Sequence, residues 1–317
     1  MSSLAGLAND PEVVAHRIVH GGDVPGAVDL TDERIAALAK FSAWAPLHQP
    51  PALALVAAAR ARWPLARQIG MFDTCFHQTL PEAQRYFALP HALHALGIKR
   101  YGFHGLAFQS ALRKLCATEP DLAAGRVVLA HLGGGSSICA SLDGRSVATS
   151  MGMTPLAGVP MATRSGSLDP GVLLHLQRQL QLSPPQIDQL LWKDSGLKGI
   201  SGESADMRVL LACASPRAEL AIEIYVNAVA ETIAAHAVSI AGIDALVFSG
   251  GIGANAWQIR DRIAQKLQWL GVTLDAAANR NGVGEISRST APLRSFVVAV
   301  DEAYEIAEAV ASFVSAH

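Results

Sequence analysis

The stretch RVVLAHLGGGSSICASLDGRSVATS, residues 126–150, decides the fold of this chain. It opens with a β-prone run, Arg126–Leu132, which three glycines interrupt before a second run at 137–142. Asp143-Gly144 leads into a third run, and an Asp-Gly pair between alternating segments is typical of a β-hairpin. The sequence therefore predicts adjacent antiparallel strands with a glycine turn between the first two.

Hydrophobic periodicity on either side predicts an alternation of strands and helices. The expected strands are 13–19, 68–73, 98–103, 245–248 and 295–300. The expected helices are 32–41 behind the capping residue Thr31, 218–240, 256–270 and 301–314, and a loop is expected around Pro46, Pro50 and Pro51. This order is typical of an α/β fold whose sheets mix hairpins with crossover connections.

Length and composition indicate an enzyme-sized globular protein. With 317 residues, half of them hydrophobic, the chain can bury a sizeable core in about two domains. The net charge of -2 gives no basic field for nucleic acid or anionic lipid. Charged and polar side chains interrupt the apolar run at 221–240, and the first twenty residues do not resemble a secretory signal. We expect a soluble, cytoplasmic protein with neither nucleic-acid nor membrane partners.

The four cysteines do not form a metal-binding pattern. Cys75, Cys116, Cys139 and Cys213 are far apart in the sequence and show no C-x-x-C spacing. We expect reduced thiols that serve as small, buried, apolar side chains.

Two glycine turns and three cationic side chains point to an anionic substrate. Gly133-Gly134-Gly135 and the turn at 250–253 offer backbone amides to phosphate, although neither fits a P-loop or a dinucleotide fingerprint. Arg17, His104 and Arg164 are each flanked by small or rigid residues. A carboxylate, Asp73, ends an expected strand. A Ser-His-Asp hydrolase is disfavoured because the chain has no G-x-S-x-G elbow.

Nine ordered stretches resemble one family. They are 16–22, 45–50, 72–81, 101–105, 131–137, 149–155, 163–170, 201–208 and 250–255. Together they resemble the acetate kinase family, part of the sugar kinase, heat-shock protein and actin superfamily. The resemblance implies a two-domain actin-like, ribonuclease H-like fold, and reversible phosphoryl transfer between ATP and acetate. A propionate or other short-chain carboxylate kinase is the alternative.

The resemblance also implies roles for individual residues. The catalytic residues it implies are Asp73, His104 and Arg164. The substrate-binding residues it implies are Arg17, Val19, Leu47, His48, Phe103 and Pro155. The nucleotide-binding residues it implies are His131, Leu132, Gly133, Gly134, Gly135, Asp206, Met207, Arg208, Gly251, Ile252, Gly253, Ala254 and Asn255. Valine at position 19 implies a preference for acetate over propionate, although a single methylene is worth only about 1–3 kcal/mol.

Metal, partner and domain expectations follow from the same resemblance. Glu302 is the implied ligand of Mg²⁺ or Mn²⁺, although an acidic residue at a helix start also complements the helix dipole without any metal. The family implies ATP and ADP as co-substrates and a homodimer. The expected domains are 1–76 with 301–317 on the acyl-substrate side, and 77–300 on the nucleotide side.

The chain also departs from the family pattern. The family opens with N-x-G-S-S-S-x-K, a motif this sequence lacks, so we expect a first domain that is incomplete at its N-terminus. Gly134, Ala254, Phe108 and Ser167 stand where the family has Asn, Glu, His and Asp. Two readings remain open: an acetate kinase whose opening segment is missing, and a shortened, catalytically impaired homologue that still binds nucleotide.

Overall fold

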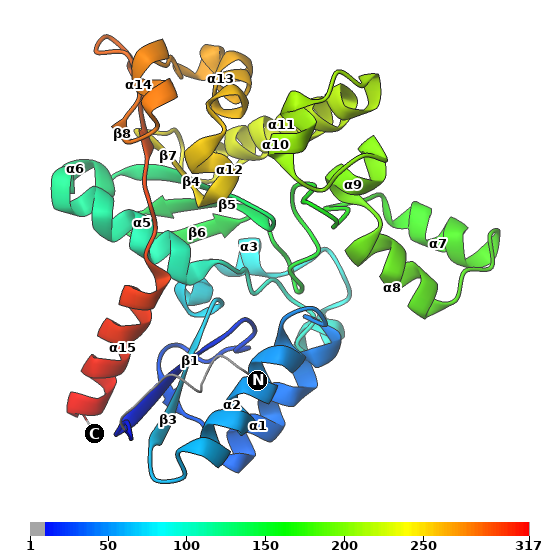
Figure 1. Ribbon diagram of the computed structural model, residues 1–317, viewed down its shortest axis with the longest axis vertical. Coiled ribbons are helices and arrows are strands. Elements are labelled where there is room, and N and C mark those ends of the chain that lie inside the picture. Colours follow the sequence, from blue (N-terminus) through cyan, green and yellow to red (C-terminus); the bar gives the residue numbers. More distant parts are fainter. Residues whose placement is uncertain (1–9, 317) are drawn as a thin grey trace.

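The computed structural model describes residues 10–316. Residues 1–9 and His317, which the domain expectation includes, lie outside that range. The described chain forms two mixed sheets flanked by helices (Figure 1). The expected α/β class is confirmed.

The smaller sheet has the strand order β1-β3-β2. β1 (Val13–Ile18) runs parallel to β3 (Arg67–Phe72), and the short β2 (Val28–Asp29) pairs antiparallel with β3. One face packs on α1 (Asp32–Ala39) and α2 (Gln49–Arg62) through Leu38 and Val56. The other face packs on α15 (Glu302–Ala316). The C-terminal helix α15 thus returns to the sheet that contains the first described strand.

The larger sheet has the order β6-β5-β4-β7-β9-β8. Its strands are β4 (Arg126–Leu132), β5 (Ser136–Leu142), β6 (Arg145–Thr149), β7 (Ala245–Ser249), β8 (Gly284–Glu285) and β9 (Arg294–Val297). β4, β5 and β6 form the expected antiparallel group, while β4, β7 and β9 are parallel. Asp143 and Gly144 both have positive φ, as a tight primed hairpin turn requires.

The large sheet is buried on both faces, because alternate residues of β4 point into different cores. Val128 and Ala130 belong to the core beneath α11 (Pro216–Ser239), whereas Val127 and Leu129 pack with α5 (Gly105–Thr118). Figure 1 shows α5 and α11 on opposite sides of this sheet. The first turn of α5 also reaches the small sheet, where Leu106 joins the α15 core.

The remaining helices connect these layers. They are η2 (Lys40–Ala43), η3 (Cys75–Thr79), α3 (Glu82–Arg85), α4 (His91–Ala95), α6 (Pro120–Ala123), α7 (Pro170–Arg178), α8 (Pro184–Lys193), α9 (Gly196–Ser201), α10 (Met207–Ala212), α12 (Gly250–Asn255), α13 (Trp257–Lys266), η4 (Gln268–Leu270) and α14 (Ala276–Asn281). No helix of residues 10–316 is long and apolar enough to cross a bilayer.

Two of the expected elements are wrong. Residues 98–103 form no strand, because the amides of Tyr101 and Gly102 both donate to the carbonyl of Gly152 instead of to a neighbouring strand. The expected loop at Pro50 and Pro51 is the start of α2, where proline is tolerated because first-turn amides have no helical partner. Smaller differences are that η4 ends the expected helix 256–270 separately from α13, and that Cys116 is exposed.

Candidate active site

Arg17 and Asp73 meet at one edge of the small sheet. Because β1 and β3 are parallel, their carboxyl ends lie side by side, and Asp73 immediately follows β3. Arg17 donates from Nε and Nη2 to the two oxygens of Asp73, each at 2.9 Å. This fork-to-fork contact fixes the guanidinium plane. The Asp73 side chain is 2% exposed and that of Arg17 is 39% exposed, so the arginine faces solvent from a buried anchor.

Glu302 holds the other side of the same guanidinium. Its carboxylate forms an ion pair with Nη1 of Arg17 from the first residue of α15. Burial alone would lower the pKa of Arg17, but Asp73 and Glu302 outweigh burial and raise it. Burial raises the pKa of Glu302, against the opposing effect of Arg17. Arg17 is therefore a permanent cation between two carboxylates.

His104 is fixed next to this pair by the backbone. It lies in the left-handed region, with φ of 58°, immediately before α5. The amide of Gly105 donates to the carbonyl of Asp73 at 2.9 Å, and a Cβ at Gly105 would lie only 2.3 Å from that oxygen. Position 105 therefore requires glycine, which holds His104 beside Asp73.

The His104 imidazole is neutral at neutral pH. Its Nδ1 lies 2.8 Å from the hydroxyl of Ser137, and its ring centroid is 4.8 Å from that of His131. Burial, followed by His131 and Arg164, lowers the pKa of His104 well below its usual value. The sequence grouped His104 with the cations; in the structure it offers a hydrogen bond and no charge.

Arg164 and Gly135 complete the group around His104. A Cβ at Gly135 would lie 2.7 Å from Nη2 of Arg164 and 3.3 Å from the His104 ring. Arg164 is 7% exposed and donates from Nη1 to the carbonyl of Pro155 at 2.7 Å. Burial lowers the pKa of Arg164 to about 10, so the guanidinium remains charged at neutral pH.

His48 belongs to the same electrostatic neighbourhood. Burial lowers the pKa of His48, and the positive charges of Arg164 and Arg17 lower it further, whereas the carboxylate of Asp73 opposes them. Its Nδ1 is buried and has no hydrogen-bond partner among the described residues. Leu47 precedes it, half-buried, in the turn before α2. An unpaired polar atom at this point is available to a bound ligand.

A small apolar cluster lies at the end of β1. Val19 packs against buried Phe103, Met151 and Met161. Pro155 is buried as well. The two methionines were not among the predicted pocket residues, although Met151 lies inside the stretch 149–155 and Met161 is three residues before Arg164.

A separate cavity of about 850 Å³ lies over the glycine turns of the large sheet. Its lining includes Gly133, Gly134, Asp206, Met207, Arg208, Gly251, Ile252 and Asn255 from the predicted nucleotide set, together with Ala205, Leu211, Ala212, Ala256, Trp257 and Gln258. Trp257 and Gln258 open α13, which begins shortly after the glycine-containing helix α12, so their place beside the cavity could have been predicted. The Asp206 carboxylate caps α10 and pairs with Arg208 at 2.6 Å.

Five residues of the predicted nucleotide set do not line this cavity. Leu132 and Gly253 are buried in the sheet core beneath it, and Ala254 is half-buried against the same core. His131 faces Ser249, with Nδ1 3.1 Å from the hydroxyl, and His104. Gly135 faces Arg164 instead of the cavity. These residues support the cavity or join it to the charged group.

The carboxylates present fit a magnesium ion that is held partly by substrate. No group of three or more His, Cys, Asp or Glu within residues 10–316 could hold a metal by itself. Mg²⁺, however, commonly takes only one or two protein carboxylates and completes its shell with phosphate oxygens and water. Glu302 and Asp73, on either side of Arg17, provide such a pair.

Comparison with known proteins reveals close relatives over nearly the whole chain. A model described as the acetokinase family matches residues 3–308. The acetate kinase of Methylocella silvestris is 46% identical over 296 residues, which are 92% of this chain and 73% of that protein. The acetate kinase of Rhodopseudomonas palustris strain TIE-1 is 46% identical over 302 residues, 93% of this chain and 75% of that protein.

Comparison with solved structures identifies the same family. The acetate kinase of Porphyromonas gingivalis superimposes with a TM-score of 0.87 at 36% identity, covering 96% of this chain and 78% of that one. A propionate kinase from Francisella tularensis superimposes with a TM-score of 0.88 at 37% identity, covering 93% and 78%. With the ordered motifs and the two mixed sheets, these matches establish that the chain belongs to the acetokinase family.

Proposed function

We propose that this chain transfers the γ-phosphoryl group of ATP reversibly to the carboxylate of acetate, giving acetyl phosphate and ADP. The observation that carries the proposal is the gathering of Arg17, His104 and Arg164 between an apolar cluster and a cavity lined by glycine amides. The cavity suits a nucleotide, because glycine amides can approach phosphate closely. The apolar cluster at Val19 and Phe103 suits a short acyl chain.

The charged group suits phosphoryl transfer. Such a reaction demands in-line positioning and stabilisation of charge on the phosphoryl oxygens rather than covalent catalysis. Arg17 would bind the acetate carboxylate, and the charged Arg164 and neutral His104 would donate hydrogen bonds to the moving phosphoryl group. Acetate is already ionised near pH 7, so no general base is required. Asp73 then serves chiefly to orient Arg17.

A divalent metal fits the same site. Glu302, with Asp73 nearby, would hold Mg²⁺ or Mn²⁺ against the phosphate oxygens of ATP. Bound there, the metal would neutralise charge on the β- and γ-phosphates. In the structure both carboxylates form ion pairs with Arg17.

The acyl pocket supports a preference for acetate over propionate. Val19 packs against the buried cluster of Phe103, Met151 and Met161, so the acyl group would meet a wall of apolar side chains that favours the smaller acid. We expect a higher kcat/KM for acetate; a clear propionate preference would contradict this. Because the chain is also similar to a propionate kinase structure, propionate is the acid to test against acetate.

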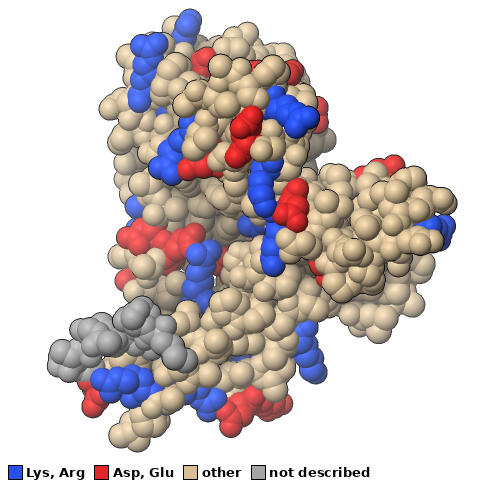
Figure 2. Space-filling model, turned by 45° about the vertical axis from the view of Figure 1, so that its right-hand side comes forward, with Lys and Arg blue, Asp and Glu red and all other residues tan. Residues whose placement is uncertain are grey.

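We also propose a cytoplasmic homodimer that acts on small molecules and binds neither nucleic acid nor membranes. Free thiols at Cys75, Cys116, Cys139 and Cys213 suit a reducing compartment. On the face shown in Figure 2, basic and acidic side chains are interspersed rather than gathered in one basic field. The two-domain division at 76 and 300 is part of this proposal.

A hydroxylamine trap tests the activity, because hydroxylamine captures acyl phosphates but not free carboxylates. Asp73→Asn removes one charge from the anchor of Arg17 and should lower ATP-dependent hydroxamate formation at least about 10²-fold. Asp29→Asn is the matched control, since Asp29 pairs bidentately with Arg67 in the same sheet, away from the site. ATP binding without any turnover by the wild type would favour the shortened nucleotide-binding homologue.

A further inference from the structure

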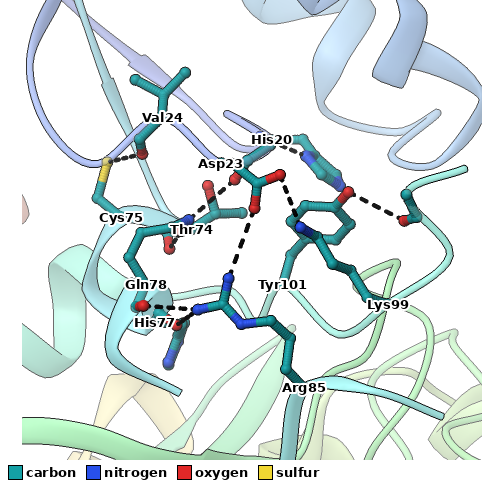
Figure 3. A network of polar contacts seen from close by, with 12 residues as sticks. His20, Asp23, Val24, Thr74, Cys75, His77, Gln78, Arg85, Lys99 and Tyr101 are labelled. Carbon is teal, nitrogen blue, oxygen red and sulfur yellow. Dashed lines mark hydrogen bonds and ion pairs between the residues drawn. The ribbon is translucent and has the colours of Figure 1, made fainter. Parts of the chain in front are cut away.

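His20 is a fully buried histidine to which the proposed chemistry gives no role. It follows β1 by two residues and is 0% exposed. Its ring stacks on Phe41, with centroids 4.3 Å apart and planes 11° apart. Tyr101 and Phe103 form T-shaped contacts with the same ring, with centroids 4.7 and 5.3 Å away. Figure 3 shows His20 beside Tyr101, with Asp23 reaching Arg85 and Lys99 just beyond it.

Two hydrogen bonds define the tautomer of His20. The amide of Gly22 donates to Nδ1 at 3.1 Å, so the proton must be on Nε2. Nε2 lies 3.2 Å from the carbonyl of Met153 and donates to it. Burial lowers the pKa of His20 to about 4, which agrees with a neutral ring at physiological pH.

The His20 backbone is tied down as well. Its amide donates to Oε1 of Gln49, and its carbonyl accepts from Nε2 of the same side chain, both at 3.0 Å. Gln49 opens α2, directly after Leu47 and His48. Gln49 therefore fixes the His20 backbone next to the small sheet. The His20 ring in turn contacts Phe103 and the carbonyl of Met153, which belong to two other segments.

Those two segments carry different parts of the site. Phe103 packs with Val19 in the apolar cluster. Met153 lies two residues before Pro155, whose carbonyl holds Arg164. The His20 ring thus contacts the acyl pocket through Phe103. Its Nε2 holds the segment whose Pro155 carbonyl binds Arg164.

We propose that His20 is a positioning residue with two separable effects: its ring sets the width of the acyl pocket through Phe103, and its Nε2–H sets Arg164 through the segment 153–155. The proposal rests on the proposed function and goes beyond it by naming what fixes acyl selectivity and the phosphoryl clamp. A residue that merely stabilised the fold would not separate the two effects.

Two substitutions of His20 test the effect of its aromatic ring separately from the effect of its hydrogen bond to Met153. His20→Gln keeps an amide donor for the Met153 carbonyl but removes the aromatic surface, and His20→Phe does the opposite. His94→Gln and His94→Phe are matched controls: His94 stacks on Tyr86 at 4.3 Å and bonds to the carbonyl of Phe87, and it is not a member of the apolar cluster of Val19, Phe103, Met151 and Met161. Phe41→Leu, which removes the stacked ring and leaves His20 intact, repeats the first test if His20→Gln does not fold.

Three measurements are made on each full-length variant. Ligand-observed NMR in the presence of ADP gives the dissociation constants of acetate and propionate, saturating substrates give kcat, and circular dichroism gives Tm. We expect His20→Gln to reduce the preference for acetate at least about threefold, since a methylene is commonly worth 10-fold or more. We expect His20→Phe to lower kcat about tenfold or more with the preference retained.

The outcomes separate the inference from the proposed function. If the wild type binds neither acid, the proposed function and the inference fall together. If the wild type binds and turns over acetate, but both His20 variants change selectivity and kcat in the same proportion, or change only Tm as the His94 variants do, the inference alone is overturned.

Discussion

At the scale of single residues, the site depends on an absent side chain. Gly135 lies where Nη2 of Arg164 and the ring of His104 converge, and any Cβ there would displace one of them. The nearer atom is the end of a flexible arginine, so the adjustment would occur in the site rather than in the sheet. Backbone strain plays no part, because Gly135 is not among the glycines with positive φ.

Gly135→Ala should therefore impair turnover more than stability. We expect kcat to fall by up to about 10²-fold, the effect of losing one transition-state donor, with a small change in Tm. Gly26→Ala is the control, because a Cβ at Gly26 meets nothing within 4 Å. Equal kcat for the two variants would mean that Arg164 does not need its observed position.

The protonation states of the proposed site residues were harder to predict from the sequence than which residues lie together. Arg17, Asp73, His104 and Arg164 were proposed from the sequence because each lies in a short stretch of family pattern, and the structure places them close together. The neutral state of His104 could not be predicted, because it results from burial beside His131 and Arg164, which come from distant segments. The role of His20 was missed for the same reason: its contacts span residues 20 to 153.

At the scale of elements, the cavity over the glycine turns is supported by a buried arginine in α13. Arg260 is 1% exposed and donates to the carbonyls of Gly253 and Ala254, each at 2.8 Å. It also donates from Nε to Oδ1 of Asn279 at 2.7 Å and from Nη2 to the Asn279 carbonyl. One side chain thus joins the end of α12 to α14 beneath the cavity wall.

Arg260→Met should destabilise the chain and weaken nucleotide binding together. The substitution leaves several buried acceptors unsatisfied, so the free energy of unfolding should fall by about 3 kcal/mol. Urea denaturation and ATP titration measure the two effects. Arg262→Ala is the control on the same helix, where the pair with Glu219 is exposed and contributes little. Unchanged ATP affinity in a folded Arg260→Met variant would show that the cavity wall is independent of this support.

Elements with strong local patterns were predictable, and those set by tertiary contacts were not. The Asp143-Gly144 hairpin and α11 follow from turn chemistry and period. Residues 98–103 have a strand-like composition but find no strand partner, because Gly152 takes their amides. α2 was missed because Pro50 and Pro51 were read as loop signals, although proline is compatible with a first helical turn.

At the scale of the whole molecule, buried neutral histidines link stability to pH. Burial lowers the pKa of His20, His77, His131 and His236 to about 4. In the unfolded chain these groups take up protons near pH 6.5. Between about pH 6.5 and 4 the unfolded state therefore binds more protons, and stability must fall as the pH falls.

Urea unfolding at a series of pH values measures this linkage. Each such histidine should contribute a slope of up to about 1.4 kcal/mol per pH unit within that window. His236→Gln should reduce the total slope by about one histidine's share. A free energy of unfolding that stays constant from pH 6.5 to 4 would contradict the burial of these neutral rings.

The central claim is that a carboxylate oxygen attacks the γ-phosphorus at a site joining the two sheets. Phosphorus NMR of the products from ATP and ¹⁸O-labelled acetate tests it most directly, because the bridging oxygen of acetyl phosphate must come from the attacking acid. With Mg²⁺ present, we predict acetyl phosphate carrying ¹⁸O in the bridging position, formed at similar rates by the wild type and by Asp29→Asn and at least about 10²-fold more slowly by Asp73→Asn. Formation of only ADP and unlabelled inorganic phosphate, or equal product from both variants, would contradict the account.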